Sequence, residues 1–184
     1  MVQEVIDYMT LAEREILRIG QITRKTLSFY REQLEVGDFD LVDIVESALT
    51  LHSQRTRRQN IQIRRELRGP AISPVIAGEI LQIMSNLILN ALDAAPESGA
   101  ELCVGVKPRK GEAVITVADN GCGMEAEVLK TLFEAHRTTK QEGTGLGLWL
   151  SRALAGKHKG RIRCRSSVQP GKTGTTFGLH LPLS

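Results

Sequence analysis

The sequence predicts an α+β fold, a two-layer α/β sandwich preceded by a long N-terminal helix. Three observations predict it. The 184 residues suffice for one domain and an appended helix, but not for two full domains. After Gly37, helical and strand periodicities alternate along the chain. The stretch 119–147 is rich in Gly, Thr and charged residues and shows neither helical nor strand periodicity over its length. Such a long irregular segment is typical of a functional loop or lid.

The composition excludes several classes of protein. With 41% hydrophobic and 24% charged residues, the chain is not wholly disordered. A net charge of +3 is too small to indicate nucleic acid, so we expect no nucleic-acid partner. Three cysteines without a C-x-x-C pair disfavour a disulfide framework or zinc ribbon and favour a reducing cytosol. The first ten residues lack the basic head and apolar stretch of a signal peptide, and no apolar run approaches the ~18–20 residues of a membrane span, so we expect no membrane segment in this chain.

Residues 1–33 predict one long helix. They contain no Pro and a single Gly, and apolar or small residues recur at steps of three and four. That stripe comprises Val5, Met9, Ala12, Ile16, Ile19, Thr23, Thr26 and Tyr30. A single helix cannot shield it, so it needs a partner helix, a second chain or the body of its own domain. We expect a boundary between a helical segment at 1–36 and a domain at 37–184.

Two further helices and one strand are predicted between residues 37 and 100. Apolar residues at helical spacing predict a helix over Asp43–Gln59, and the alternation over Ile61–Leu67 predicts a strand. Gly69–Pro70 turns the chain. A strongly apolar helix then covers Glu79–Ala95 and is closed by Pro96.

The remaining elements are four strands and one helix. Alternating apolar residues and turn signals predict the strands at Leu102–Lys107, Ala113–Ala118, Ile162–Ser166 and Thr176–Leu181. Between the second and third of these strands, a helix is predicted over Leu148–Lys157.

Two glycine clusters flank the irregular stretch. DNGCGM at 119–124 follows a strand, and GTGLGL at 143–148 precedes a helix. Alternate glycines let backbone N–H groups converge on an anion, and a helix N-terminus adds its positive end, so the second cluster suits phosphate. A Rossmann fingerprint would need glycine at Leu148, and a Walker loop would need it at Ser166, so both are excluded.

The helix 79–95 carries a polar row on an otherwise apolar element. Gln82, Asn86, Asn90 and Asp93 recur at steps of three and four. Such a row is unfavourable on a buried helix unless it faces something polar, such as a hydrated magnesium ion and a triphosphate. The amide oxygen of Asn90 is a hard ligand of the kind that Mg²⁺ accepts. The alternative is that these side chains cap neighbouring loops.

Five motifs in order resemble the catalytic ATP-binding domain of sensor histidine kinases. This domain is part of the wider family that includes DNA gyrase B, mismatch-repair ATPases and heat-shock chaperones. The motifs are EILQIMSNLILNALDAA (79–95), DNGCGM (119–124), LFEAHRTTK (132–140), GTGLGL (143–148) and GTTF (174–177). The resemblance covers residues 37–184. It implies a mixed sheet with helices on one face, an ATP lid, the cofactors ATP and Mg²⁺, and ATP-dependent protein-histidine kinase activity.

The resemblance also implies roles for individual residues. Asn90 would coordinate Mg²⁺, and Asn86, Asn90 and Lys140 would form the catalytic group. Asp119 would accept a hydrogen bond from the exocyclic amine of adenine, and Thr176 would join Asp119 through ordered water. The full ATP-binding set would be Asn86, Asn90, Asp93, Asp119, Gly121, Gly123, Met124, Thr139, Lys140, Gly143, Thr144, Gly145, Leu146, Gly147, Leu148 and Thr176.

The position of Asn86 separates the kinases from their hydrolytic relatives. In gyrase-type and mismatch-repair enzymes a glutamate stands there and activates water, whereas an amide takes up no proton near neutrality. The resemblance therefore favours a kinase over a hydrolytic ATPase, which is the first alternative. An anti-sigma-type serine kinase shares the pocket but lacks the long leading helix, and it is the second alternative.

We expect the phosphoacceptor histidine to lie outside this chain. None of His52, His136, His158 and His180 is followed by the acidic residue typical of that site. Residues 1–36 resemble the second helix of a dimerisation hairpin, without the first helix that bears the histidine. The resemblance implies a homodimer in the full-length protein, a dimerisation or phosphoacceptor domain and a response regulator receiver domain as partners, and a bacterial cytoplasmic location.

Overall fold

The computed structural model describes residues 35–136 and 145–184. The helix expected over residues 1–33 and its role in dimerisation lie outside this range, as do four predicted site residues, Thr139, Lys140, Gly143 and Thr144. Val36–Ser184 forms one compact unit.

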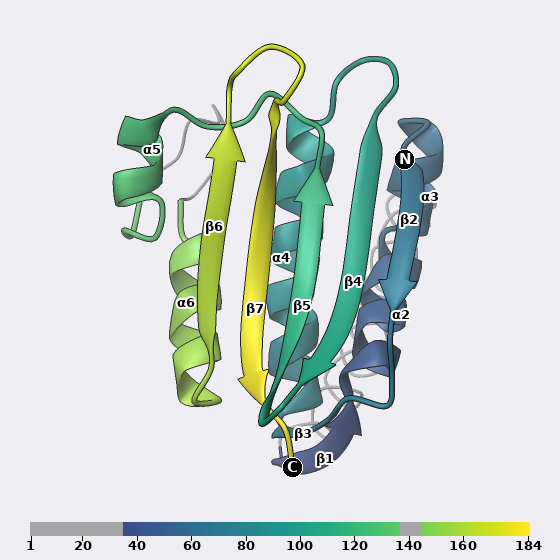
Figure 1. The fold of residues 1–184 in the computed structure, drawn as a ribbon, viewed down its shortest axis with the longest axis vertical. Helices are drawn as coiled ribbons and strands as arrows, with labels where there is room; N and C mark the ends of the chain where they lie inside the picture. The colour runs from purple at the N-terminus through teal and green to yellow at the C-terminus, as the bar shows by residue number, and fades with distance from the viewer. Residues whose placement is uncertain (1–34, 137–144) are drawn as a thin grey trace, which may run out of the picture. The chain divides into compact units, whose positions relative to one another are not determined.

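A five-stranded mixed sheet forms one layer of the domain, in the order β2-β4-β5-β7-β6 (Figure 1). Its strands are β2 (Gln62–Leu67), β4 (Glu101–Arg109), β5 (Glu112–Asp119), β6 (Arg161–Ser167) and β7 (Gly174–Pro182). β2 pairs with β4 in parallel, and the other neighbours are antiparallel. The predicted α+β class with a mixed sheet is therefore confirmed.

Helices cover one face of this sheet and form the second layer (Figure 1). They are α2 (Leu41–Leu51), α3 (Ser53–Arg58), α4 (Ala77–Ala94) and α6 (Gly147–Lys157). The central helix α4 buries Ile80, Ile83 and Leu87 completely. Alternate residues of the strands meet them from the sheet, with Val104 and Ile115 fully buried. These apolar contacts hold α4 over the middle of the sheet.

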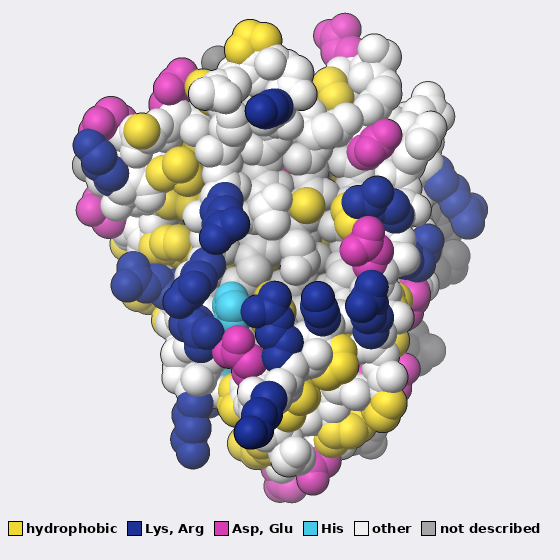
Figure 2. Space-filling model, in the orientation of Figure 1, with side chains coloured by type: hydrophobic (Ala, Val, Ile, Leu, Met, Phe, Trp, Pro, Cys, Tyr) yellow, Lys and Arg dark blue, Asp and Glu magenta, His cyan; other side chains and the backbone are white. Residues whose placement is uncertain are grey.

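Figure 2 views the opposite face of the sheet, where Lys and Arg side chains gather. Along β6, the exposed residues Arg161, Arg163 and Arg165 alternate with half-buried residues. Period-two alternation thus places charge on one face of this strand and its half-buried residues on the other. No helix among the described residues is long and apolar enough to cross a membrane.

Three short elements were not predicted from the sequence. β1 (Gly37–Asp40) and β3 (Ile72–Val75) form a second, two-stranded antiparallel sheet, and α5 (Ala126–Thr131) forms within the stretch expected to be irregular. All three are four to six residues long, too short for a periodic pattern to emerge.

The helix expected over residues 43–59 is also two helices. α2 begins earlier because Asp40 accepts a hydrogen bond from Val42 N at 3.0 Å and caps the first turn. The helix is then interrupted at His52, which ends α2 and precedes α3.

Candidate functional site

The side of α4 that faces α6 carries the first predicted site residue. Asn86 Nδ2 donates a hydrogen bond to Ser151 Oγ at 2.9 Å, and Ser151 Oγ donates to Gly147 O at 2.9 Å. A Cβ built on Gly147 would lie 2.4 Å from Asn86 Oδ1. The N-terminal turn of α6 therefore lies directly against Asn86, and position 147 has no room for a side chain.

This turn is the N-terminus of helix α6. α6 begins at Gly147, and the residue before it, Leu146, has no polar side-chain atom that could cap the first backbone N–H groups. Gly145 adopts a positive φ of 65° just upstream. The backbone N–H groups in the first turn of a helix and the positive end of the helix dipole attract anions. That phosphates bind beside Asn86 stays a prediction, for which this turn supplies backbone N–H groups.

Asp119 lies at the other end of the site, where β5 ends. Its Oδ1 accepts hydrogen bonds from Gly121 N at 2.9 Å and from Thr175 N at 3.2 Å. Neither bond occupies Oδ2. Burial raises the pKa of this carboxyl above its ordinary value, and the two backbone hydrogen bonds oppose that shift. Asp119 is therefore a fixed, partly desolvated acceptor.

The structure corrects the prediction that Thr176 is the threonine beside Asp119. Thr175, not Thr176, lies opposite Asp119 in the β5–β7 register. Thr175 is 6% exposed and its Oγ1 lies 2.9 Å from Ser166 Oγ, whereas Thr176 is exposed. Because side chains alternate along a strand, a shift of one residue moves the hydroxyl to the opposite face of the sheet.

A sequence signal could have identified Thr175. Phe177, Leu179 and Leu181 mark the buried face of β7, and Thr175 continues their period of two. Ser166, which the sequence analysis missed, completes this corner. Its Oγ accepts from Met124 N at 2.8 Å and donates to Gly174 O at 2.9 Å.

Gly121 and Gly123 are required by the protein's own backbone. A Cβ on Gly121 would lie 2.4 Å from Ala94 O at the end of α4. A Cβ on Gly123, which has a φ of +73°, would lie 2.0 Å from Ser167 O. These glycines were expected to admit a nucleotide to the backbone. The structure adds that each lets one segment of main chain pack directly on another.

Asn90 and Asp93 lie on the same face of α4 as Asn86, at helical steps of four and three. Asn90 is half-buried. Asp93 forms an ion pair with Arg55 of α3, and the two side chains are 29% and 40% exposed. The described residues contain no group of three or more His, Cys, Asp or Glu side chains able to hold a metal ion. Amide oxygens and phosphate oxygens are among the ligands that Mg²⁺ accepts.

The two ends of the site are joined by α4. Asn86 and Ala94 are eight residues apart, which corresponds to about 12 Å along a helix. An anion-attracting helix terminus thus stands at one end and a carboxylate with an unoccupied oxygen at the other. Such a pair suits an extended ligand with a charged tail and a hydrogen-bonding head.

Comparisons with known proteins identify the family. Residues 76–184 match the family described as histidine kinase-, DNA gyrase B-, and HSP90-like ATPase. The chain is 35% identical over 176 residues to the sensor protein FixL of Bradyrhizobium diazoefficiens, covering 93% of this chain and 34% of FixL. It is 31% identical over 181 residues to the signal transduction histidine-protein kinase AtoS of Escherichia coli, covering 97% of this chain and 29% of AtoS. The chain thus spans about a third of the length of these relatives.

Solved structures share the fold. The catalytic domain of histidine kinase ThkA superposes with a TM-score of 0.74 at 24% identity, covering 82% of this chain and 97% of that domain. The fold, the ordered motifs and the sequence relatives agree. The chain belongs to the histidine kinase-, DNA gyrase B- and HSP90-like ATPases and contains the ATP-binding catalytic domain of a sensor histidine kinase.

Proposed function

We propose that this chain binds Mg·ATP along α4 and presents the γ-phosphoryl group to a histidine that is not present in this chain. The observation that carries the proposal is the placing of Asn86 with the α6 N-terminus at one end of α4 and of Asp119 at the other. ATP supplies the transferable phosphoryl group, and Mg²⁺ neutralises charge on the phosphates. Catalysis then rests on positioning and electrostatic stabilisation.

Each residue of the site has a proposed role. Asp119 accepts the hydrogen bond of the adenine amine through the oxygen that Gly121 and Thr175 leave unoccupied. Asn90 provides an amide oxygen to Mg²⁺. Asn86 fixes the first turn of α6, whose N–H groups bind phosphate. Lys140 adds a cation near the terminal phosphate.

The surroundings of three histidines support a phosphoacceptor outside the chain. His52 lies 2.6 Å from Ser85 Oγ, and His158 is buried and lies 2.8 Å from Glu79 Oε2. His180 lies between Glu112 and Arg161. All three imidazoles are engaged in contacts within the fold, so each would have to leave its partners before it could attack a phosphoryl group.

Two other functions of the same family are less well supported. A hydrolytic ATPase needs a base that activates water, and Asn86 is an amide whose Nδ2 already donates to Ser151. A serine kinase of the anti-sigma type would use the same pocket. It is distinguished by its product, because phosphoserine survives acid whereas phosphohistidine does not.

We further propose partners for the whole protein. The relatives are sensor proteins and histidine kinases, which supports a response regulator receiver domain as the eventual phosphate acceptor. A dimerisation domain with the phosphoacceptor histidine, formed by a homodimer of the full-length protein in the bacterial cytoplasm, would supply the nucleophile.

Calorimetric titration of Mg·ATP and Mg·GTP tests the site. Wild type should bind Mg·ATP and discriminate against GTP, whose oxygen at that place cannot donate to Asp119. Asp119→Asn keeps an oxygen for Gly121 N and Thr175 N but presents an NH₂ group to the adenine amine. It should weaken Mg·ATP binding by at least about tenfold. No heat with wild type, or equal affinity of wild type and Asp119→Asn, would refute the proposal.

A labelling experiment tests the reaction. With labelled ATP, the chain alone should acquire no acid-labile phosphate, and it should label weakly a separately supplied dimerisation domain, because proximity is lost. An Asn90→Asp variant is the control for the metal position. Acid-labile label on this chain alone would contradict the reading of its histidines.

A further inference from the structure

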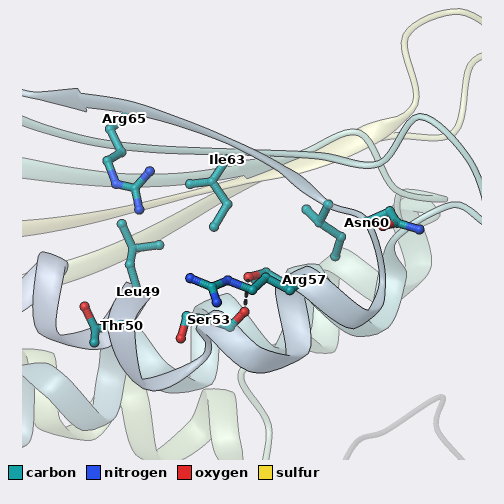
Figure 3. Close-up of a pocket in the computed structure, with 9 residues that line it drawn as sticks. Leu49, Thr50, Ser53, Arg57, Asn60, Ile63 and Arg65 are labelled. Carbon is teal, nitrogen blue, oxygen red and sulfur yellow. Dashed lines mark hydrogen bonds between the residues drawn. The ribbon is translucent and has the colours of Figure 1, made fainter.

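A groove unrelated to the nucleotide site lies between helices α2 and α3 and strand β2 (Figure 3). Its volume is about 620 Å³. Leu49, Ile61 and Ile63 provide apolar surface, and Arg57 and Arg65 provide two guanidinium groups. Figure 3 shows the strand as one wall and the helices as the other. None of the residues that line it belongs to the site along α4.

The strand wall offers unused backbone hydrogen-bonding groups. Among the described strands, β2 pairs only with β4 and therefore forms an edge of the sheet. Gln62 N donates to Ala100 O and Arg68 N donates to Val106 O, so the even-numbered residues of β2 direct their backbone toward β4. By alternation, the backbone N–H and C=O groups of Ile63 and Arg65 point away from the sheet. A further strand could pair with them.

The electrostatics of the groove favour an anionic occupant. None of the residues lining it is acidic. Arg55, Arg57 and Arg58 occupy the last turn of α3. The nearest carboxylate partner, Glu46, lies 3.5 Å from Arg65, and both side chains are nearly half exposed, so this pair is weak and exchangeable. A carboxylate from a ligand could replace Glu46 beside Arg65.

We infer that this groove binds an extended acidic segment of a partner protein by strand addition to β2. The main chain of the segment would pair with Ile63 and Arg65, an apolar side chain would pack on Leu49 and Ile61, and carboxylates would meet Arg57 and Arg65. A second copy of this chain fits poorly, because pairing two β2 edges brings arginines against arginines. Cationic edge residues also repel basic strands, so they favour an acidic one.

The probe is the acetylated eight-residue peptide Thr-Val-Thr-Glu-Thr-Val-Thr-Glu, in which Val and Glu alternate along one face of the strand; it is labelled with a fluorophore and titrated into the 184-residue chain. Two matched peptides serve as controls. In one, alternate backbone nitrogens are methylated, and in the other, Lys replaces Glu. The Val–Glu peptide should bind, both controls should bind at least about tenfold more weakly, and amide exchange at Ile63 and Arg65 should slow on binding.

Adjacent arginines on β2 provide the matched variants. Arg65 lines the groove, whereas Arg64 points to the opposite face, where its Nε lies 3.2 Å from Glu66. Arg65→Glu should weaken the Val–Glu peptide by about tenfold or more and Arg64→Glu by less than about twofold, with thermal unfolding confirming that both fold.

Three results would overturn the proposal. Equal loss in the two variants would mean non-specific attraction between charges. Binding of the methylated peptide as tight as that of the Val–Glu peptide would mean that side chains alone hold the peptide, without pairing of the main chain. Self-association that Arg65→Glu abolishes and Arg64→Glu does not would assign the edge to a second copy of the chain.

Discussion

The corner formed by Thr175, Ser166 and Asp119 makes a strong prediction about two adjacent threonines. Thr175→Val keeps nearly the same volume in a site that is 6% exposed but removes the hydroxyl that lies 2.9 Å from Ser166 Oγ. Ser166 Oγ keeps its bonds with Met124 N and Gly174 O, so no buried polar group is left without a partner. The expected loss of stability is therefore that of one hydrogen bond, about 0.5–1.5 kcal/mol.

That loss translates into measurable shifts. For a domain of this size, each kcal/mol corresponds to about 2–4 °C in Tm. Thr175→Val should also weaken Mg·ATP binding about tenfold if its hydroxyl helps to order the adenine end. Thr176→Val changes an exposed side chain and should alter stability by less than about 0.5 kcal/mol and leave Mg·ATP affinity unchanged. Calorimetry and thermal unfolding of both variants provide the test. If Thr176→Val reduced ATP affinity and Thr175→Val did not, the assignment of this corner would be wrong.

Two further predictions concern helix contacts. Gly147→Ala places a Cβ 2.4 Å from Asn86 Oδ1 and should destabilise the domain by about 1–3 kcal/mol. Gly156 lies on the same helix, and a Cβ there would meet nothing within 4 Å, so Gly156→Ala should stabilise the domain by about 0.5–1 kcal/mol. Urea unfolding that ranks the two variants the other way would contradict this packing. Burial, and secondarily the charge of Arg55, lowers the pKa of His52 from its ordinary value of 6.5. The unfolded chain therefore binds a proton at His52 before the folded chain does. The free energy of unfolding should decrease as pH falls from 6.5 through the lower pKa of the folded state. His52→Gln should remove that part of the pH dependence of urea unfolding, and an unchanged profile would refute the assignment.

The long elements could be predicted from sequence because their periodicities extend over several turns or pleats. The helix expected over Glu79–Ala95 is observed as Ala77–Ala94, and the strand expected over Ala113–Ala118 as Glu112–Asp119. The break at His52 could not be predicted, because apolar spacing continues in α2 up to Leu51 and neither Pro nor Gly marks the break. Tertiary contacts, such as that of His52 with Ser85, accompany it.

The candidate site was predictable in its motifs but not in its contacts. The order of the motifs gave Asn86 and Asp119, yet the bond from Asn86 to Ser151 joins residues 65 positions apart in the sequence, and no local pattern reveals it. Thr175 was missed for a different reason. The strand was expected to begin at Thr176, although the period-two pattern of buried residues extends back to Thr175. In a strand, an error of one residue selects the side chain on the wrong face.

The close packing of main chain on main chain at Gly121 and Gly123 restricts how this protein could acquire a new base preference. Because almost any side chain at those two positions would collide with a carbonyl, mutation has little freedom to reshape the backbone that follows Asp119. A change from adenine to another purine would have to pass through Asp119 or its immediate neighbours. A library limited to Asp119, Ser166 and Thr175 should therefore contain most of the accessible routes to altered nucleotide selectivity.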